Sequence, residues 1–198
     1  MTSPRRSGRR PGDSGTREAI LAAAKESFAA SGYNATTIRG VGRAAGVDPA
    51  LVHHFFGTKQ DLFAAAMELP VDPAQMVPAL LADGLDGLGE RLVRMFLLVW
   101  DGTPGQGPML ALLRSAAAND QAAAMLREFL THAILGPLAR AAGHDRPELR
   151  ASLIGSQMMG LAVARYIVRL EPLATADADK IAPIIGPTVQ RYLTGDLP

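Results

Sequence analysis

The chain has 198 residues, 48% of them apolar and 5% aromatic, which suits one globular domain, or a small domain joined to a larger one, built from helices. It contains no cysteine, which excludes disulfide bonds and thiolate chemistry, and no apolar run approaches the roughly 18 residues of a membrane span. The net charge is +1, but it is unevenly distributed: residues 1–60 contain nine Lys or Arg and four Asp or Glu, a charge of +5, and the rest of the chain has −4. This distribution suggests that the first third binds a polyanion.

Residues 1–15 are rich in Arg, Gly, Ser and Pro and are expected to form a disordered basic arm. Proline, glycine and polar residues follow its arginines, where a secretory signal would need an apolar stretch, so the predicted location is the cytoplasm. The arginines either solubilise the chain or reach the minor groove or the phosphates of duplex DNA. They are Arg5, Arg6, Arg9 and Arg10.

The first predicted helix begins after Thr16, whose hydroxyl can cap it, and ends at Gly32. Apolar residues at every fourth position give it one buried stripe, which consists of Ile20, Ala24 and Phe28. A second, shorter helix is expected over about residues 37–45, with Arg39 and Arg43 facing outward.

Gly46 supplies the positive φ for a tight turn, and Asp48 then caps a short third helix that begins at Pro49. Thr58 opens a fourth helix with a pattern similar to a capping box. Two short helices around a glycine-containing turn, with one helix before them and one after, predict a helix-turn-helix domain over residues 16–69. The residues expected in its core are Phe28, Ile38, Val41, Val47, Val52, Phe56 and Leu62.

Four spaced motifs mark this domain: Gly32-Tyr33, Thr36-Thr37-Ile38, Ala44-Ala45-Gly46-Val47 and His53-His54-Phe55-Phe56-Gly57-Thr58-Lys59-Gln60-Asp61-Leu62. Together they resemble the DNA-binding domain of TetR-family regulators. We therefore expect an all-α fold of about nine helices. An N-terminal three-helix helix-turn-helix DNA-binding domain, within residues 16–69, would precede a helical effector-binding and dimerisation domain of residues 70–198.

The resemblance implies that Thr37 and Lys59, at the starts of the second and fourth helices, hold DNA phosphates. The family usually has tyrosine at the position of His53, and histidine is shorter and can titrate. Exposed residues of the third helix would read the bases, with Arg39 as a helper, mainly through apolar contacts and DNA shape. The predicted DNA-binding set is Thr37, Arg39, Pro49, Ala50, Leu51, His53, His54 and Lys59.

Further helices are expected in the body, among them one over about 120–142 with a kink at Pro137. The helix over about 147–170 is apolar on two sides, so it lies deep in a core or is shared with a second subunit. In the family the last two helices of each subunit form a four-helix interface. We therefore expect a homodimer through residues 147–170 and 177–194, with recognition helices about 34–36 Å apart.

Bulky, soft side chains in the body are either ordinary core or the lining of an effector cavity, which the resemblance implies. His132 and Arg165 would supply polar contacts to the ligand. The predicted set is Met95, Phe96, Trp100, Met109, Leu113, Phe129, His132, Met158, Met159 and Arg165. A small apolar or amphipathic molecule would move the fourth helix, so that the spacing of the recognition helices no longer fits the operator.

No nucleophile elbow, P-loop, dinucleotide fingerprint or HExxH motif occurs, so an enzyme is not expected. His53 and His54 would point about 100° apart on a helix, and neither a metal nor another cofactor is expected. The predicted function is transcriptional repression, relieved when a small molecule releases the protein from a palindromic operator. The alternative is a helical protein-interaction module without DNA binding, and salt-dependent binding to duplex DNA distinguishes the two.

Overall fold

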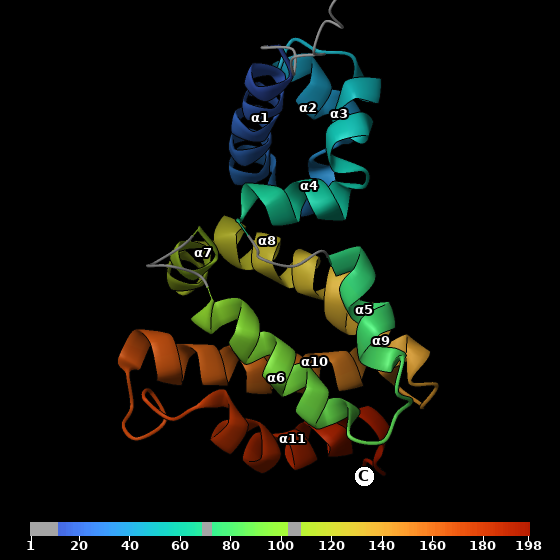
Figure 1. Cartoon of the computed structure of the whole chain (residues 1–198), viewed down its shortest axis with the longest axis vertical. Coiled ribbons are helices and arrows are strands. Elements are labelled where there is room, and N and C mark those ends of the chain that lie inside the picture. Colours follow the sequence, from blue (N-terminus) through green and yellow to red (C-terminus); the bar gives the residue numbers. More distant parts are fainter. Residues whose placement is uncertain (1–11, 69–72, 103–107) are drawn as a thin grey trace, which may run out of the picture.

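The computed structural model describes residues 12–68, 73–102 and 108–198, and every regular element in these ranges is a helix. The expected all-α fold is therefore confirmed. Figure 1 shows a small upper group, α1 to α4, standing on a larger group, α5 to α11. The described ranges hold ten continuous helices, because α8, η1 and α9 follow one another without a break, as do α10 and η2.

The upper group consists of α1 (Gly12–Ala35), α2 (Ile38–Ala44), α3 (Pro49–Phe56) and α4 (Lys59–Ala66). Two expectations for the first helix need correction. It begins at Gly12, so residues 12–15 are helical rather than disordered, and the four arginines of the arm lie outside the described residues. Gly32 does not end the helix: its left-handed φ of 78° bends the chain, which then continues to Ala35.

Side-chain caps define where α2, α3 and α4 begin. The Thr37 hydroxyl accepts from the amide of Gly40 at 3.0 Å, and the Asp48 carboxylate accepts from the amide of Ala50 at 2.8 Å. Thr58 and Asp61 form the predicted capping box at α4. These local contacts satisfy amide groups that the first turns leave without helical partners, and so they fix the orientation of three short helices.

The core of the upper group continues into the lower one. Five of the seven expected core residues are buried, whereas Ile38 and Val47 are half-buried against them. Three aromatic side chains, Phe28, Tyr33 and Phe63, pack against one another with ring centroids 4.9–5.9 Å apart. The same cluster includes buried side chains of the lower group, namely Leu112, Leu113, Met125, Leu126, Phe129, Ala133 and Ala162.

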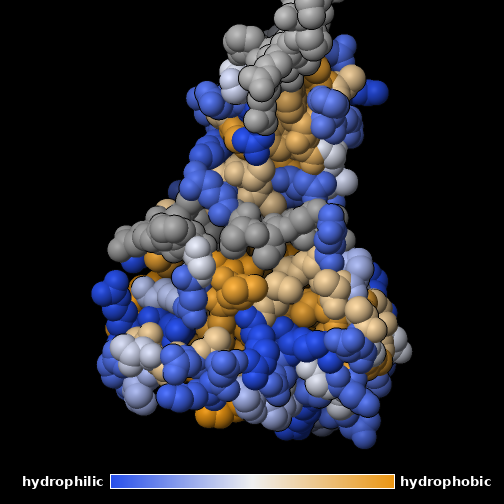
Figure 2. Space-filling view, viewed as in Figure 1, coloured by the Kyte–Doolittle hydropathy of each residue, from blue (hydrophilic) through white to orange (hydrophobic). Residues whose placement is uncertain are grey.

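The lower group contains the remaining helices, several of which enclose a second apolar core. Figure 2 shows apolar side chains gathered across the middle of one face of this group. The elements are α5 (Pro73–Leu81), α6 (Leu88–Asp101), α7 (Pro108–Ala116), α8 (Asp120–Phe129), η1 (Leu130–Leu135), α9 (Gly136–Ala141), α10 (Pro147–Ala162), η2 (Val163–Val168) and α11 (Ala178–Thr194).

A π-helical segment, η1, precedes Pro137, where a kink was expected. Proline donates no backbone hydrogen bond, and in a regular helix its ring collides with the carbonyl four residues earlier. A wider turn moves that carbonyl away, so the helical path can continue through the proline. The segment gives one compound helix over residues 120–141, close to the predicted 120–142.

The two sides of α10 have different surroundings. Ile154, Met158 and Leu161 are buried in the second core, whereas Ser152 and Ser156 are exposed on the opposite side. By length and composition alone, Pro147–Val168 is also apolar enough to cross a membrane, contrary to the expectation that no run was long enough. The same property is common in helices that pack inside globular domains, and α10 packs against α9 and α11.

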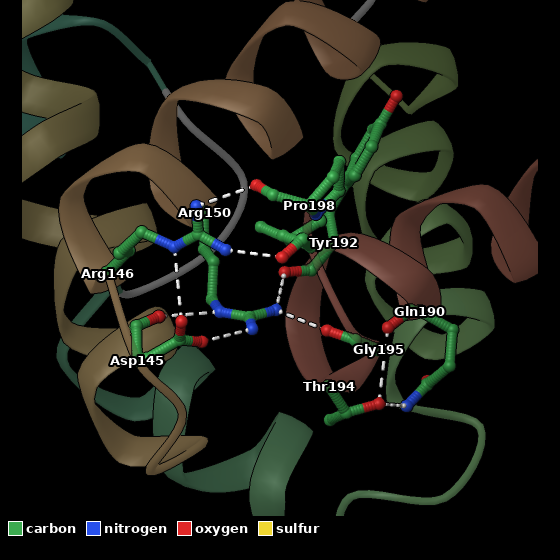
Figure 3. A network of polar contacts seen from close by, with 9 residues as sticks. Asp145, Arg146, Arg150, Gln190, Tyr192, Thr194, Gly195 and Pro198 are labelled. Atoms are coloured by element: carbon green, nitrogen blue, oxygen red, sulfur yellow. Dashed lines mark hydrogen bonds and ion pairs between the residues drawn. The ribbon is translucent and has the colours of Figure 1, made fainter.

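Arg150 joins the start of α10 to the end of α11 (Figure 3). Its side chain is 2% exposed, and its Nε and Nη2 donate to the carbonyl and the carboxylate of Asp145 at 2.6 and 2.5 Å. Its Nη1 donates to the carbonyls of Tyr192 and Gly195, both at 2.9 Å. One buried guanidinium thus satisfies acceptors of three residues, one before α10 and two at the end of α11.

Two glycines allow α6 and α11 to cross with their backbones in contact. A Cβ on Gly89 would overlap the carbonyl oxygen of Gly186 and the backbone nitrogen of Gln190. The Gln190 side chain accepts from the Gly89 amide at 2.8 Å and so closes the same crossing. The two helices therefore pack more closely there than any larger side chain would permit.

Replacing Gly89 with alanine is expected to lower the free energy of unfolding by about 2 kcal/mol, because the backbones of α6 and α11 must separate to admit the methyl group. Denaturant unfolding measures the change. The control is Gly15→Ala in α1, where an added Cβ meets nothing within 4 Å. Equal stability of the Gly89 variant and the wild type would contradict the described crossing.

Candidate DNA-binding surface and effector cavity

Helix α3 presents a short exposed face. Val52 and Phe56 anchor it in the core of the upper group, whereas Ala50, His53 and His54 are exposed. Leu51, a large apolar side chain, is also exposed, at 40%. Pro49 is half-buried at the first position of the helix. The helix can thus be approached from outside along one side.

Thr37 and Arg39 lie beside this face, at the start of α2, and both are exposed. The hydroxyl oxygen of Thr37 accepts from the amide of Gly40, so its own O–H remains available as a donor. Arg39 carries a charge that is always present and five N–H donors. Both residues can therefore donate hydrogen bonds to an anion.

His53 has one of its two ring nitrogens occupied. Its Nδ1 lies 2.7 Å from the carbonyl oxygen of Gly57. A carbonyl oxygen only accepts, so Nδ1 must carry the proton and donate. The free Nε2 is then an acceptor in the neutral ring and becomes a donor only in the charged ring. His53 is therefore suited to a phosphate contact only when it is protonated.

Lys59, at the first position of α4, is half-buried rather than free in solvent. Its Nζ donates to the carbonyl of Asn34 at 3.0 Å and lies 4.5 Å from the centroid of the Tyr33 ring. Burial lowers the pKa of Lys59, and the carboxylate of Glu128 opposes that shift. Burial also raises the pKa of Tyr33 to about 12, aided by the charge of Asp61.

A cavity of about 100 Å³ lies between the helices of the lower group. Among the residues that the structure describes, none with a charged side chain belongs to its wall. Seven of the ten side chains predicted for an effector site belong to this wall. They are Met95, Phe96, Trp100, Leu113, Phe129, Met158 and Met159.

The two expected polar contacts do not line the cavity. Arg165 is 8% exposed, pairs with Asp101 at 3.1 Å, and donates to the carbonyls of Leu173 and Ala176. Its donors hold the chain that leads into α11, so they are already used within the fold. His132 is exposed and outside the wall, and the side chain of Met109 lies outside the described residues.

Sequence reasoning missed nine residues of the wall because it selected bulky or sulfur-containing side chains. The missed ones are mostly ordinary aliphatic residues on the same helix faces, such as Leu92 and Val99 beside Met95 and Phe96 on α6. Several of them lie three or four residues from a predicted cavity residue, on the same face of its helix, and could have been predicted from that spacing. The nine are Met76, Leu92, Val99, Leu126, Leu130, Ile134, Leu135, Gly155 and Ala162.

An open groove of about 690 Å³ runs along the outer side of α10, between it and the compound helix of α8, η1 and α9. It also includes Ser152 and Ser156, and it shares six residues with the cavity wall, namely Leu113, Leu126, Leu130, Leu135, Gly155 and Met159. The cavity therefore borders the exposed side of α10. Among the described residues, no group of three His, Asp or Glu is placed to hold a metal ion.

Comparison with known proteins gives two matching family models. One is described as bacterial regulatory proteins, tetR family, and matches residues 20–66; the other is a tetracyclin repressor-like C-terminal domain and matches residues 86–193. Among curated proteins, no relative matches the sequence.

Solved structures are similar to the chain over most of its length. A TetR-family regulator from Streptomyces coelicolor is 42% identical, with 94% of this chain and 99% of that one covered and a TM-score of 0.47. NalD, the secondary repressor of the MexAB-OprM multidrug efflux pump in Pseudomonas aeruginosa, is 21% identical over 93% and 98%, with a TM-score of 0.49. GusR from Salmonella enterica is 19% identical over 91% and 94%, with a TM-score of 0.41.

Proposed function

Because the chain belongs to the TetR family of bacterial regulatory proteins, we propose that it is a repressor that binds a palindromic operator as a homodimer and leaves it when an apolar effector fills the cavity. The observation that carries this proposal is the exposed side of α3. Its anchors, Val52 and Phe56, are buried, while Ala50, Leu51 and His54 stand clear of the fold. A helix held in this way fits the major groove.

The phosphate contacts are assigned to residues on either side of α3. Thr37 caps α2 and Lys59 begins α4, where the helix dipole and the first amides that the caps do not use favour an anion. Arg39 and the charged form of His53 add two further donors. In this arrangement the phosphates position α3, and the apolar contacts of Ala50 and Leu51 favour thymine methyl groups.

The dimer is assigned to the outer side of α10 and to α11. Ser152, Ser156 and Gly160 are small, exposed and aligned on one side of α10, which permits close approach of a second copy. On α11, Ile184 is 76% exposed, so its apolar side chain is available to a second copy. A two-fold axis through these helices would place the two α3 helices about 34–36 Å apart.

The effector is assigned to uncharged, lipophilic molecules. The cavity wall offers aromatic rings and four methionines, namely Met76, Met95, Met158 and Met159. Burying a charge in such a wall would cost several kcal/mol without a partner, because no wall residue can pair with it. Methionine side chains adapt to different apolar shapes, so the site suits a class of compounds better than one compound.

Selection of binding sites from random duplex DNA tests the proposal. The full-length protein should enrich a palindrome whose half-sites are about one helical turn apart, centre to centre. Enrichment of a single unrepeated site would contradict the two-fold dimer. Failure to bind any duplex at low salt would refute DNA binding and favour the protein-interaction module.

Replacing Lys59 with alanine is expected to weaken binding to every duplex and to reduce the slope of log affinity against log salt by about one per subunit, because one phosphate contact is lost. Fluorescence anisotropy across a salt series measures the slope. Lys25→Ala removes a lysine of α1 that pairs with Glu68, beyond the C-terminal end of α4, and as the matched control it should leave the slope unchanged. An unchanged slope in the Lys59 variant would remove Lys59 from the phosphate contacts.

A further inference from the structure

Two adjacent residues of α8 reach different parts of the molecule. Phe129 is 1% exposed and belongs to the cavity wall. Its ring also packs on the upper group, with centroid distances of 4.5 Å to Phe63 of α4 and 6.0 Å to Tyr33 of α1. One side chain therefore contacts both the interior of the cavity and the aromatic core beneath the DNA-binding helices.

Glu128, the preceding residue, makes a polar connection to the same region. Its carboxylate accepts from the amide of Asn34 at 2.8 Å, and the carbonyl of Asn34 accepts from Lys59 Nζ at 3.0 Å. Two hydrogen bonds thus lead from α8 to the side chain proposed to hold a phosphate. A carboxylate acceptor makes the first of them stronger than a bond between neutral groups.

The bend at Gly32 makes Asn34 available for these contacts. Its positive φ of 78° interrupts the regular path of α1 just before Asn34. The amide and the carbonyl of Asn34 then face partners outside their own helix, Glu128 and Lys59. The Lys59 ammonium uses one N–H on Asn34 and rests over the Tyr33 ring, so it retains donors for a DNA phosphate.

We propose that Glu128 is a positioning residue for Lys59, acting through Asn34, and that Phe129 makes this position depend on whether the cavity is filled. The inference rests on the proposed function, because it needs Lys59 at a phosphate and an effector in the cavity. A molecule against the Phe129 ring displaces α8. Glu128 moves with it, and the Lys59 ammonium loses its alignment with the phosphate.

The first experiment measures DNA binding by four full-length proteins: the wild type, Glu128→Ala, Lys59→Ala and the double variant. The duplex is the one recovered by selection. Glu128→Ala should reduce the salt slope about as much as Lys59→Ala does, and the double variant should bind no more weakly than Lys59→Ala alone. Glu128→Gln should bind nearly as the wild type does, since its amide oxygen still accepts from Asn34.

A second contact between α8 and α1 provides the matched control. The Gln121 side chain donates to the carbonyl of Ala29 at 2.8 Å, so it docks α8 on α1 without touching the Asn34–Lys59 pair. Gln121→Ala should leave the salt slope unchanged. Equal slopes in the Gln121 and Glu128 variants, or additive losses in the double variant, would overturn the positioning role. Thermal unfolding confirms that each variant is folded.

The second experiment adds toluene, an uncharged hydrocarbon suited to a small apolar cavity. Trp100 is the sole tryptophan and belongs to the cavity wall, so its fluorescence reports occupancy directly. Toluene should change this fluorescence in all variants, and should weaken DNA binding by the wild type and Gln121→Ala but not by Glu128→Ala. An equal response in Glu128→Ala overturns the link and leaves DNA binding standing. A wild type that binds no duplex refutes the proposed function itself.

Discussion

Replacing Ala50 with glutamate is expected to lower affinity for the selected duplex by about 100-fold or more. Ala50 is exposed at the second position of α3, where the new carboxylate would face the phosphates lining the groove. Juxtaposed like charges cost several kcal/mol, and a dimer would carry two such groups. An acidic residue in the first turn of a helix is favourable for the helix itself, so the variant should fold.

Fluorescence anisotropy with the selected duplex measures the loss. Ala141→Glu makes the same chemical change at an exposed position of α9, in the lower group, and should bind as the wild type does. If both glutamate variants retained full affinity, α3 could not be the helix that enters the groove. If both lost it equally, the effect would come from net charge rather than from position.

Replacing Arg150 with methionine is expected to lower the free energy of unfolding by about 2 kcal/mol, because a buried donor is removed and the carbonyls that it satisfies are left without a partner. Methionine fills part of the space but donates nothing. The carbonyls of Asp145, Tyr192 and Gly195 would then lose their shared donor. Chemical denaturation of the full-length protein measures the change.

Arg146→Met is the matched control, because Arg146 belongs to the same network but its side chain is 40% exposed. Exposed ion pairs contribute little, so we expect a loss below about 1 kcal/mol. A similar loss in both variants would mean that burial of Arg150 does not set its contribution.

Acid provides a further readout of the Arg150 contact. The hydrogen bond from Arg150, first among several causes, lowers the pKa of Asp145 below its ordinary value of 3.8. A depressed pKa in the folded protein stabilises it above the ordinary value, and that stabilisation is lost as the pH falls towards the folded pKa. Stability should therefore decline below about pH 4, and the decline should be smaller in Arg150→Met.

The helix-turn-helix could be predicted closely because its signals are local. Thr37, Asp48 and Thr58 each cap a helix through an amide two or three residues away, so their spacing in the sequence reports the structure directly. Gly32 shows the limit of this reasoning. A change of backbone direction at Gly32 was predictable. That the helix resumes afterwards was not, because the residues that follow are held by a contact distant in sequence, from the Asn34 amide to Glu128 of α8.

Contacts distant in sequence could not be predicted in this way. Glu128 meets Asn34 across 94 positions, and nothing in the flanking residues distinguishes it from an ordinary exposed acid. Arg165 was expected to supply a polar contact to a ligand in the cavity. Its partner Asp101 lies 64 positions earlier, so only the folded chain shows that its charge is already paired.

The glycine crossing of α6 and α11 has a mechanical consequence for the cavity. At Gly89 and Gly186 the backbones of α6 and α11 are in direct contact. The α6 side of the cavity should therefore move little relative to α11, which is assigned to the dimer. The opposite side contains η1, a π-helical segment of the kind often found at functional sites. An entering molecule should therefore displace the η1 side more than the α6 side, so that the distortion reaches the upper group while the dimer contacts are unchanged.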